Sequence, residues 1–131
     1  MIHSFRPSAQ WYEDWPFDVD TSVRVEAAVT GPAADRAVER FLEPLTQDRD
    51  DSVADGVRVH HWGGFTAETT PRADGDGWVI VLESSGEDAF SSLQGAADEL
   101  ADALRSTPGE VHLAWRELPA TRAAGAGADD R

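Results

Sequence analysis

The side chains best suited to binding or to acid–base chemistry lie on two segments whose sequences alternate as β-strands do. These segments are residues 57–62 and 110–118, and successive residues of a strand point to opposite faces. A histidine can exchange a proton near neutral pH, and an arginine can hold an anion. The candidate binding residues on one face of these strands are Arg58, His60, Trp62, His112 and Arg116.

Other kinds of site lack the residues that they need. The chain has no cysteine, which excludes thiolate metal centres and a cysteine nucleophile. His60 and His61 are neighbours on a strand and point apart, so they cannot share a metal ion. No glycine-rich segment has the lysine and the strand-to-helix setting of a phosphate-binding loop, and no acidic loop has the calcium-binding frame. We therefore expect neither a metal nor a cofactor.

The N-terminal 20 residues are rich in aromatic side chains and show neither strand nor helix periodicity. Trp11, Tyr12, Trp15 and Phe17 stand close together there, and tryptophan is a favoured anchor in protein interfaces. We expect an irregular arm whose aromatic side chains either pack on their own domain or contact another chain. Trp11 and Trp15 are its candidate binding residues.

The charge of the chain restricts its partners. Asp and Glu number 25, against 11 basic residues that are all arginine, and the net charge is −14. Such a protein repels nucleic-acid phosphates and anionic membranes, so we expect no direct binding to either. The acidity favours a basic protein partner, although solubility or adaptation to salt would also explain it. No signal peptide and no long apolar stretch is present, which predicts a soluble, cytoplasmic protein.

The hydrophobic pattern predicts one domain over residues 21–118, after an arm of residues 1–20 and before a disordered tail of residues 119–131. Apolar residues alternate in the strand segments and recur at helical spacing in the helix segments. Residues 69–77 are expected to form a hairpin loop. The predicted strands are 21–30, 57–62, 78–83 and 110–118, and the predicted helices are 31–45 and 90–105.

The order strand, helix, strand, strand, helix, strand resembles the ferredoxin-like split β-α-β arrangement of the α+β class. The resemblance implies a four-stranded antiparallel sheet in the order 4-1-3-2, with both helices on one face. Residues 78–83 are apolar on both faces, which suits a central strand. Arg58, His60 and Trp62, together with His112 and Arg116, would then lie on the uncovered face.

These expectations favour a small, non-catalytic binding or assembly protein over an enzyme. It would act through the uncovered sheet face and the aromatic arm, as an inhibitor or immunity-type protein does, and a second copy of the chain covering that face would make a homodimer. A nucleic-acid-mimicking inhibitor is an alternative that the acidity also allows.

The element order and the sheet face also resemble the dimeric α+β barrel proteins, such as the antibiotic-biosynthesis monooxygenase-like enzymes, in which two domains pair around a cavity. That resemblance implies a cofactor-independent enzyme or a small-ligand-binding protein. His60 or His112 would be its base, and Arg58 or Arg116 would hold an anion.

Overall fold

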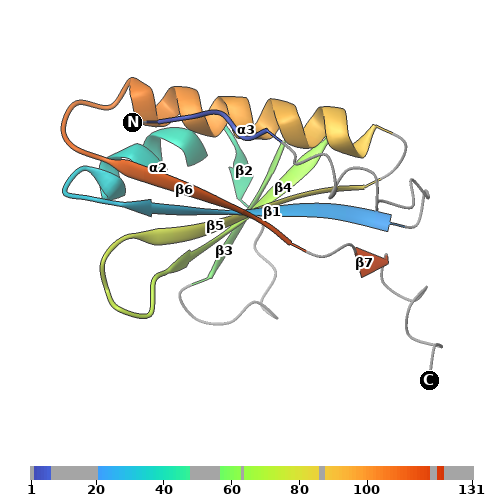
Figure 1. The fold of residues 1–131 in the computed structure, drawn as a ribbon, viewed down its shortest axis with the longest axis horizontal. Coiled ribbons are helices and arrows are strands. Elements are labelled where there is room, and N and C mark those ends of the chain that lie inside the picture. Colours follow the sequence, from blue (N-terminus) through green and yellow to red (C-terminus); the bar gives the residue numbers. More distant parts are fainter. Residues whose placement is uncertain are drawn as a thin grey trace.

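The computed structural model describes residues 2–6, 21–47, 57–62, 64–85, 88–118 and 121–122 of the chain. These residues form an α+β fold in which an antiparallel sheet carries two helices on one face (Figure 1). The strand order is β2-β3-β4-β5-β1-β6, and β7 pairs with β1. The strands are β1 (Thr21–Thr30), β2 (Thr46–Gln47), β3 (Arg58–Trp62), β4 (Phe65–Pro71), β5 (Trp78–Ser85), β6 (His112–Glu117) and β7 (Thr121–Arg122). The helices are α2 (Ala34–Leu42) and α3 (Ala89–Arg105).

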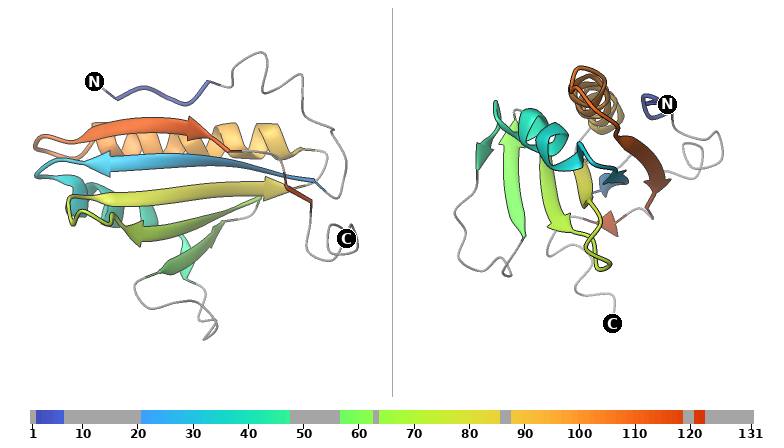
Figure 2. Two further views of the ribbon diagram at one scale, coloured as in Figure 1. Left: turned by 60° about the horizontal axis from the view of Figure 1, so that its bottom comes forward. Right: turned by 90° about the vertical axis from the view of Figure 1, so that its left-hand side faces the viewer.

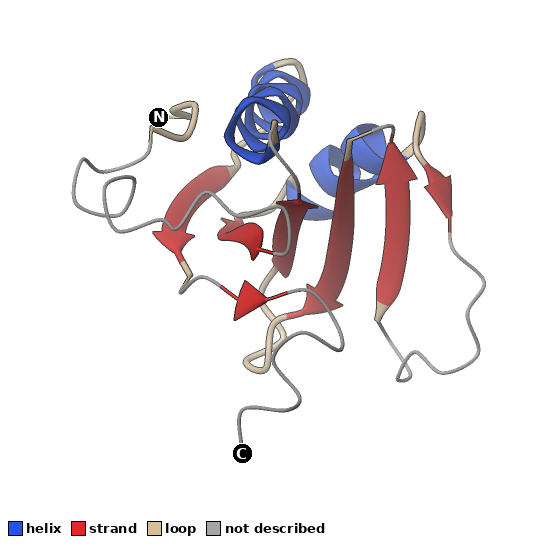
Figure 3. Cartoon of the chain, turned by 90° about the vertical axis from the view of Figure 1, so that its right-hand side faces the viewer, coloured by secondary structure: helices blue, strands red, loops and turns tan. Residues whose placement is uncertain are grey.

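Each helix buries one apolar stripe against the sheet. The buried residues of α2 recur at intervals of one and three, and those of α3 follow the same helical period. Helix α2 begins after Gly31, whose φ of +107° suits glycine, and ends before Pro44. It is therefore shorter than the predicted 31–45. Figure 3 shows both helices on the same side of the sheet.

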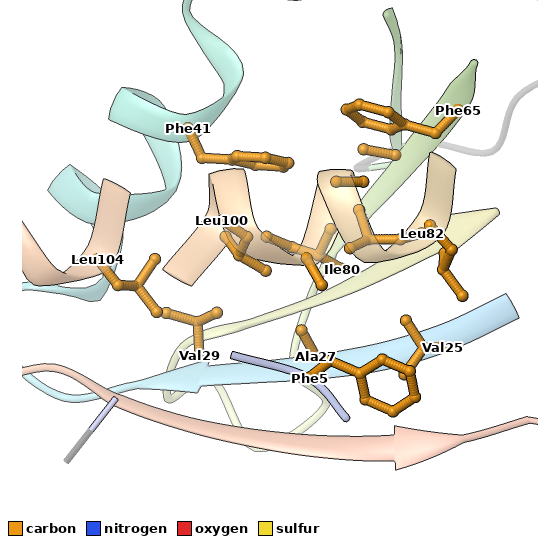
Figure 4. Close-up of a cluster of buried hydrophobic side chains, with 14 of the residues drawn as sticks. Phe5, Val25, Ala27, Val29, Phe41, Phe65, Ile80, Leu82, Leu100 and Leu104 are labelled. Atoms are coloured by element: carbon orange, nitrogen blue, oxygen red, sulfur yellow. The ribbon is translucent and has the colours of Figure 1, made fainter. Parts of the chain in front are cut away.

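The core lies between this helix layer and one face of the sheet. Every second residue of β1 is fully buried, from Val23 to Val29, and Ile80 and Leu82 of β5 lie beside them. Phe41 of α2 and several leucines of α3 pack onto these strands (Figure 4). The core therefore identifies the face of β1 and β5 that lies under the helices. The pairing of each remaining strand in the sheet then decides which of that strand's side chains lie under the helices.

The prediction that the strand at 57–62 lies next to the strand at 78–83 was wrong. Residues 65–71, predicted in part as loop, form strand β4, which pairs with both β3 and β5 and so separates them. The chain reverses between Trp62 and Phe65, which are paired with each other. Strand β4 was missed because its buried positions include Ala67 and Thr69, so its alternation is weakly apolar. The expected adjacency of the strands at 110–118, 21–30 and 78–83 is present.

Residues 2–6 run beside α3 and β6 and close the core at that edge of the sheet (Figure 2). Phe5 is only 4% exposed, and its ring lies 5.7 Å from that of Trp115. The Trp115 Nε1 donates a hydrogen bond of 2.8 Å to the carbonyl oxygen of His3, and Gln94 donates one of 2.7 Å to that of Phe5. The predicted binding residues Trp11 and Trp15 lie outside the described residues, as does most of the 119–131 tail.

Candidate functional site

Strand pairing places Arg58, His60 and Trp62 on the helix-covered side of the sheet. His60 pairs with Ala67, and Ala67 pairs with Leu82 of the core. Directly paired residues of an antiparallel sheet share a face, so His60 faces the helix layer, and alternation places Arg58 and Trp62 with it. The prediction that these three side chains occupy the uncovered face was therefore wrong.

His112 and Arg116 lie on the opposite, helix-free face, as predicted. They pair with Thr30 and Glu26 of β1, which alternate with the buried residues of that strand. Arg116 donates two hydrogen bonds to the Glu26 carboxylate, at 3.0 and 3.1 Å, and the His112 Nε2 lies 2.8 Å from Glu110 Oε2. Both side chains are thus held by carboxylates at an exposed surface.

The predicted site is consequently divided between two faces of the sheet. His60 and His112 do not share a face, and Arg58 cannot line one cavity on the sheet face together with Arg116. The sequence pattern suggested that Val57 and Val59 faced the core, because they are the apolar residues of their segment. In the structure both are half-buried, and the pairing of Val59 with Glu68 places Val59 on the helix-free face. The pairing with β4, which is a long-range contact, overrides the local pattern.

The helices are too few to cover the whole sheet. Packed helices lie about 8–10 Å apart and strands about 4.8 Å apart, so two helices cover roughly four strands. Helices α2 and α3 pack on β1, β4 and β5. Strands β2 and β3 extend beyond them, and the inward side chains of β3 therefore line hollows at the edge of the helix layer.

The first hollow is an apolar groove beside Trp62, with a volume of about 420 Å³. Trp62 is 55% exposed and is the one large hydrophobic side chain that is exposed among the described residues. Phe65, its paired neighbour, is only 8% exposed and forms part of the wall. The groove is lined by Arg40, Phe41, Pro44, Leu45, Trp62, Phe65, Glu99, Asp102, Ala103 and Ser106.

The rim of this groove carries opposite charges on its two sides. Glu99 and Asp102 project from α3, and Arg40 projects from α2. Asp102 also forms an exposed ion pair of 2.8 Å with Arg105. The Glu99 carboxylate has no hydrogen bond or ion pair with any residue that the structure describes. The α3 side of the groove therefore presents an acidic edge next to an apolar floor.

The second hollow lies between α2 and β3 and is lined mostly by charged side chains. Its volume is about 660 Å³. The guanidinium of Arg58 lies 5.4 Å from the centre of the Trp78 ring, and its Nη1 donates to Glu39 Oε2 at 3.0 Å. The lining residues are Arg36, Glu39, Arg40, Leu42, Glu43, Leu45, Arg58 and His60.

His60 is 5% exposed, and its buried Nδ1 has no hydrogen-bond partner in the described structure. Burial lowers the pKa of His60 below the ordinary value of 6.5, and the positive charge of Arg58 lowers it further. Glu39 opposes this shift, and His61 adds to it. The imidazole is therefore neutral near pH 7 and can donate only one N–H.

The sequence analysis missed the arginines of α2 that line this hollow. Arg36 and Arg40 are four residues apart, a spacing that places two side chains on one face of a helix. That signal was present in the sequence. The strand that lies opposite them was recognised, but its orientation was not.

The architecture defines the protein as an α+β protein with a two-helix layer on a larger antiparallel sheet. The sequence matches no known protein-family model and has no significant match among curated proteins. Within the described ranges, no three His, Asp or Glu side chains are grouped as metal ligands would be. None of the helices described is both long enough and apolar enough to span a bilayer.

Proposed function

We propose that the protein is a non-catalytic binding protein whose groove beside Trp62 accepts an apolar side chain of a partner protein. The exposure of Trp62 above an apolar floor is the observation that carries this proposal. A soluble domain seldom leaves a large aromatic side chain beside an open apolar groove without a partner for it. Tryptophan is also the side chain that most often dominates binding energy in protein interfaces.

The charges at the groove favour a partner with a basic residue next to its apolar anchor. Glu99 and Asp102 form one edge of the groove, and the net charge of the whole chain is −14. A cationic side chain beside the anchor would pair with that edge, and the overall charge would speed the encounter. Binding of this kind weakens as salt is added.

The helix-free sheet face supports a second contact surface for the same function. Thr70, Val79, Ala28 and Ala114 form one row of paired residues across four strands, and Val81 lies in the next row. A second copy of the chain that packed on this row would cover it and make a homodimer. Glu26 and Glu83 alternate with arginines on this face, which gives little support to nucleic-acid mimicry.

For the fold we propose a ferredoxin-like unit built from β1, β4, β5 and β6. These four strands, numbered along the chain and taken without the others, follow the order 4-1-3-2, and both helices lie on one of their faces. Strands β2 and β3 would then be an addition at one edge. This addition supplies the Trp62 side of the groove. The proposed binding site therefore includes the strands that the ferredoxin-like unit lacks.

Site-specific photo-crosslinking tests the proposal. A photo-crosslinking amino acid is placed in one of three positions, at the exposed groove residue Ser106, at Val81 or at the exposed hairpin residue Asp76, which serves as the control. We expect a crosslink to a different protein from position 106 and none from position 76. A crosslink from position 81 to a second copy of the chain would support the homodimer.

The captured protein is then purified and its affinity measured directly. Trp62→Ala should weaken binding by at least about tenfold, since it removes a central aromatic anchor. Asp76→Ala should leave the affinity unchanged. Equal affinity of the Trp62→Ala variant and the wild type, with both folded, would refute the proposal.

A further inference from the structure

The hollow between α2 and β3 gathers positive charge in a strongly acidic protein. Its walls hold three of the 11 basic residues of the chain, Arg36, Arg40 and Arg58, against two glutamates. One of these glutamates, Glu39, is already paired with Arg58. The remaining guanidinium groups therefore outnumber the carboxylates that could neutralise them, although the molecule as a whole carries a charge of −14.

Arg36 and Arg40 have no ionic partner among the described residues. Neither forms an ion pair or a hydrogen bond with another described side chain. Their four-residue spacing on α2 places two like charges next to each other, which disfavours the helix. Guanidinium groups present several N–H donors in a plane and bind the oxygens of carboxylates and phosphates in pairs.

The floor of the hollow contains a second unsatisfied polar group. His60 is 95% buried, being only 5% exposed, and its Nδ1 lacks a hydrogen-bond partner in the described structure. A buried ring nitrogen without a partner is costly, and a bound group or an ordered water is one way to satisfy it. Burial and the charge of Arg58 lower the pKa of His60, so the neutral ring adds an N–H donor without adding another positive charge.

Arg58, in one wall of the hollow, is fixed in position from two sides. Its guanidinium lies against the Trp78 ring and donates to Glu39. The Trp78 Nε1 in turn donates a hydrogen bond of 2.7 Å to Asp35 of α2. Helix α2 and the sheet are thus joined across the hollow by side-chain contacts, and little rearrangement would be needed to bind a small group.

We propose that this hollow is a binding site for an oxyanion, a carboxylate or phosphate group, held by Arg36 and Arg40 with His60 in the floor. The hollow shares Arg40 and Leu45 with the groove beside Trp62. The site does not depend on the proposed function, because a free anion needs no protein partner to bind there. The net charge of the chain is negative, so it would not by itself suggest that the protein binds an anion.

The test is a titration of the full chain, isotopically labelled, followed by NMR. Inorganic phosphate and acetate are added in separate experiments at neutral pH, with sodium chloride adjusted to keep the ionic strength constant. We expect saturable shifts of the His60 ring and of the Nε–Hε signals of Arg36 and Arg40, with affinity in the millimolar range for one anion or both. Phosphate binding alone would define a tetrahedral site, and acetate binding alone a carboxylate site.

Two double variants separate a specific site from general attraction. Arg36→Gln with Arg40→Gln should weaken binding by at least about tenfold, because two charge-assisted contacts are lost. Arg72→Gln with Arg105→Gln changes the net charge equally but removes arginines outside the hollow, and it should change the affinity by less than about twofold. His60→Gln should weaken binding by a smaller factor, and an unchanged affinity would exclude the histidine from the site.

The proposal is overturned if the shifts of the arginine signals fail to saturate with both anions, or if the two double variants lose affinity equally. The Trp62→Ala variant keeps the test independent of the proposed function. It should bind the anion as the wild type does, even though it loses the partner protein.

Discussion

Gly77→Ala probes the turn that positions Trp78, the ring against which Arg58 packs. Gly77 has a φ of +101°, a conformation that residues with a side chain rarely adopt. A Cβ added there would lie 2.2 Å from the carbonyl oxygen of Val29 and 3.0 Å from the Cα of Thr30. Both atoms belong to the backbone of β1, a central strand of the sheet, so neither can move away without disturbing the sheet.

The expected loss of stability has two parts. Backbone strain at such a φ costs about 1–3 kcal/mol, and forcing an extra carbon into a packed site costs about 1–3 kcal/mol. Replacing glycine lowers the entropy of the unfolded chain, which returns about 0.4–1 kcal/mol. We therefore expect Gly77→Ala to lower the free energy of unfolding by about 1–5 kcal/mol, with about 3 kcal/mol at the middle of these ranges.

Gly75→Ala is the matched control in the same turn. Gly75 has a φ of +78°, but an added Cβ would meet no atom within 4 Å. Only the strain remains, about 1–2 kcal/mol, and the lower entropy of the unfolded chain offsets about 0.4–1 kcal/mol of it, so the free energy of unfolding should fall by about 1 kcal/mol.

Urea unfolding, followed by tryptophan fluorescence, measures both variants. With a denaturant dependence of about 1–3 kcal/mol/M, the midpoint of Gly77→Ala should fall by about 1 M or more. The indole N–H signal of Trp78 in NMR spectra should also shift, because the hydrogen bond to Asp35 would be disturbed. Equal midpoints for the two variants would refute the close approach of Gly77 to β1.

Two further predictions concern buried side chains. Because burial lowers the pKa of His60, the unfolded chain takes up a proton below about pH 6.5 before the folded protein does. The free energy of unfolding should therefore fall as the pH drops below about 6.5. His60→Gln should reduce this fall when urea unfolding is measured across a pH series, and an identical pH dependence would contradict the assignment. Phe5→Ala should lower the free energy of unfolding by about 3 kcal/mol and shift the fluorescence of Trp115 to longer wavelength, because the ring that closes the core is lost. A loss below about 1 kcal/mol would show that residues 2–6 are not part of the core.

Helices and strands with a strong hydrophobic periodicity were predicted correctly from the sequence. Features that depend on strand pairing alone were not. Strands β1, β5 and β6 and helix α3 were found because their buried residues are plainly apolar, as Val23 to Val29 illustrate. Strand β4 was not found because Thr69, a polar residue, occupies a buried position. That single omission also changed the neighbour of β5.

The candidate site shows the same division between local and long-range information. Arg58, His60 and Trp62 were selected correctly as residues facing one side of a strand, since alternation is a local property. Which side they face depends on the pairing of His60 with Ala67, and no pattern within residues 57–62 contains it. The apolar character of Val57 and Val59 even favoured the opposite orientation.

The location of both hollows follows from the width of the sheet relative to its cover. A helix layer of roughly 20 Å shields about four strands at 4.8 Å spacing, and residues 2–6 close the edge at β6, so the uncovered inner face must fall at β2 and β3. If all the side chains on this uncovered inner face were apolar, they would expose a large hydrophobic patch. They are not all charged, because one of them is a tryptophan. The chain places arginine and histidine where α2 provides charged neighbours, and tryptophan where α2 and α3 provide an apolar floor. Both proposed binding sites therefore result from one structural condition: strand β3, second from the edge of the sheet, has an inner face that extends past the helices.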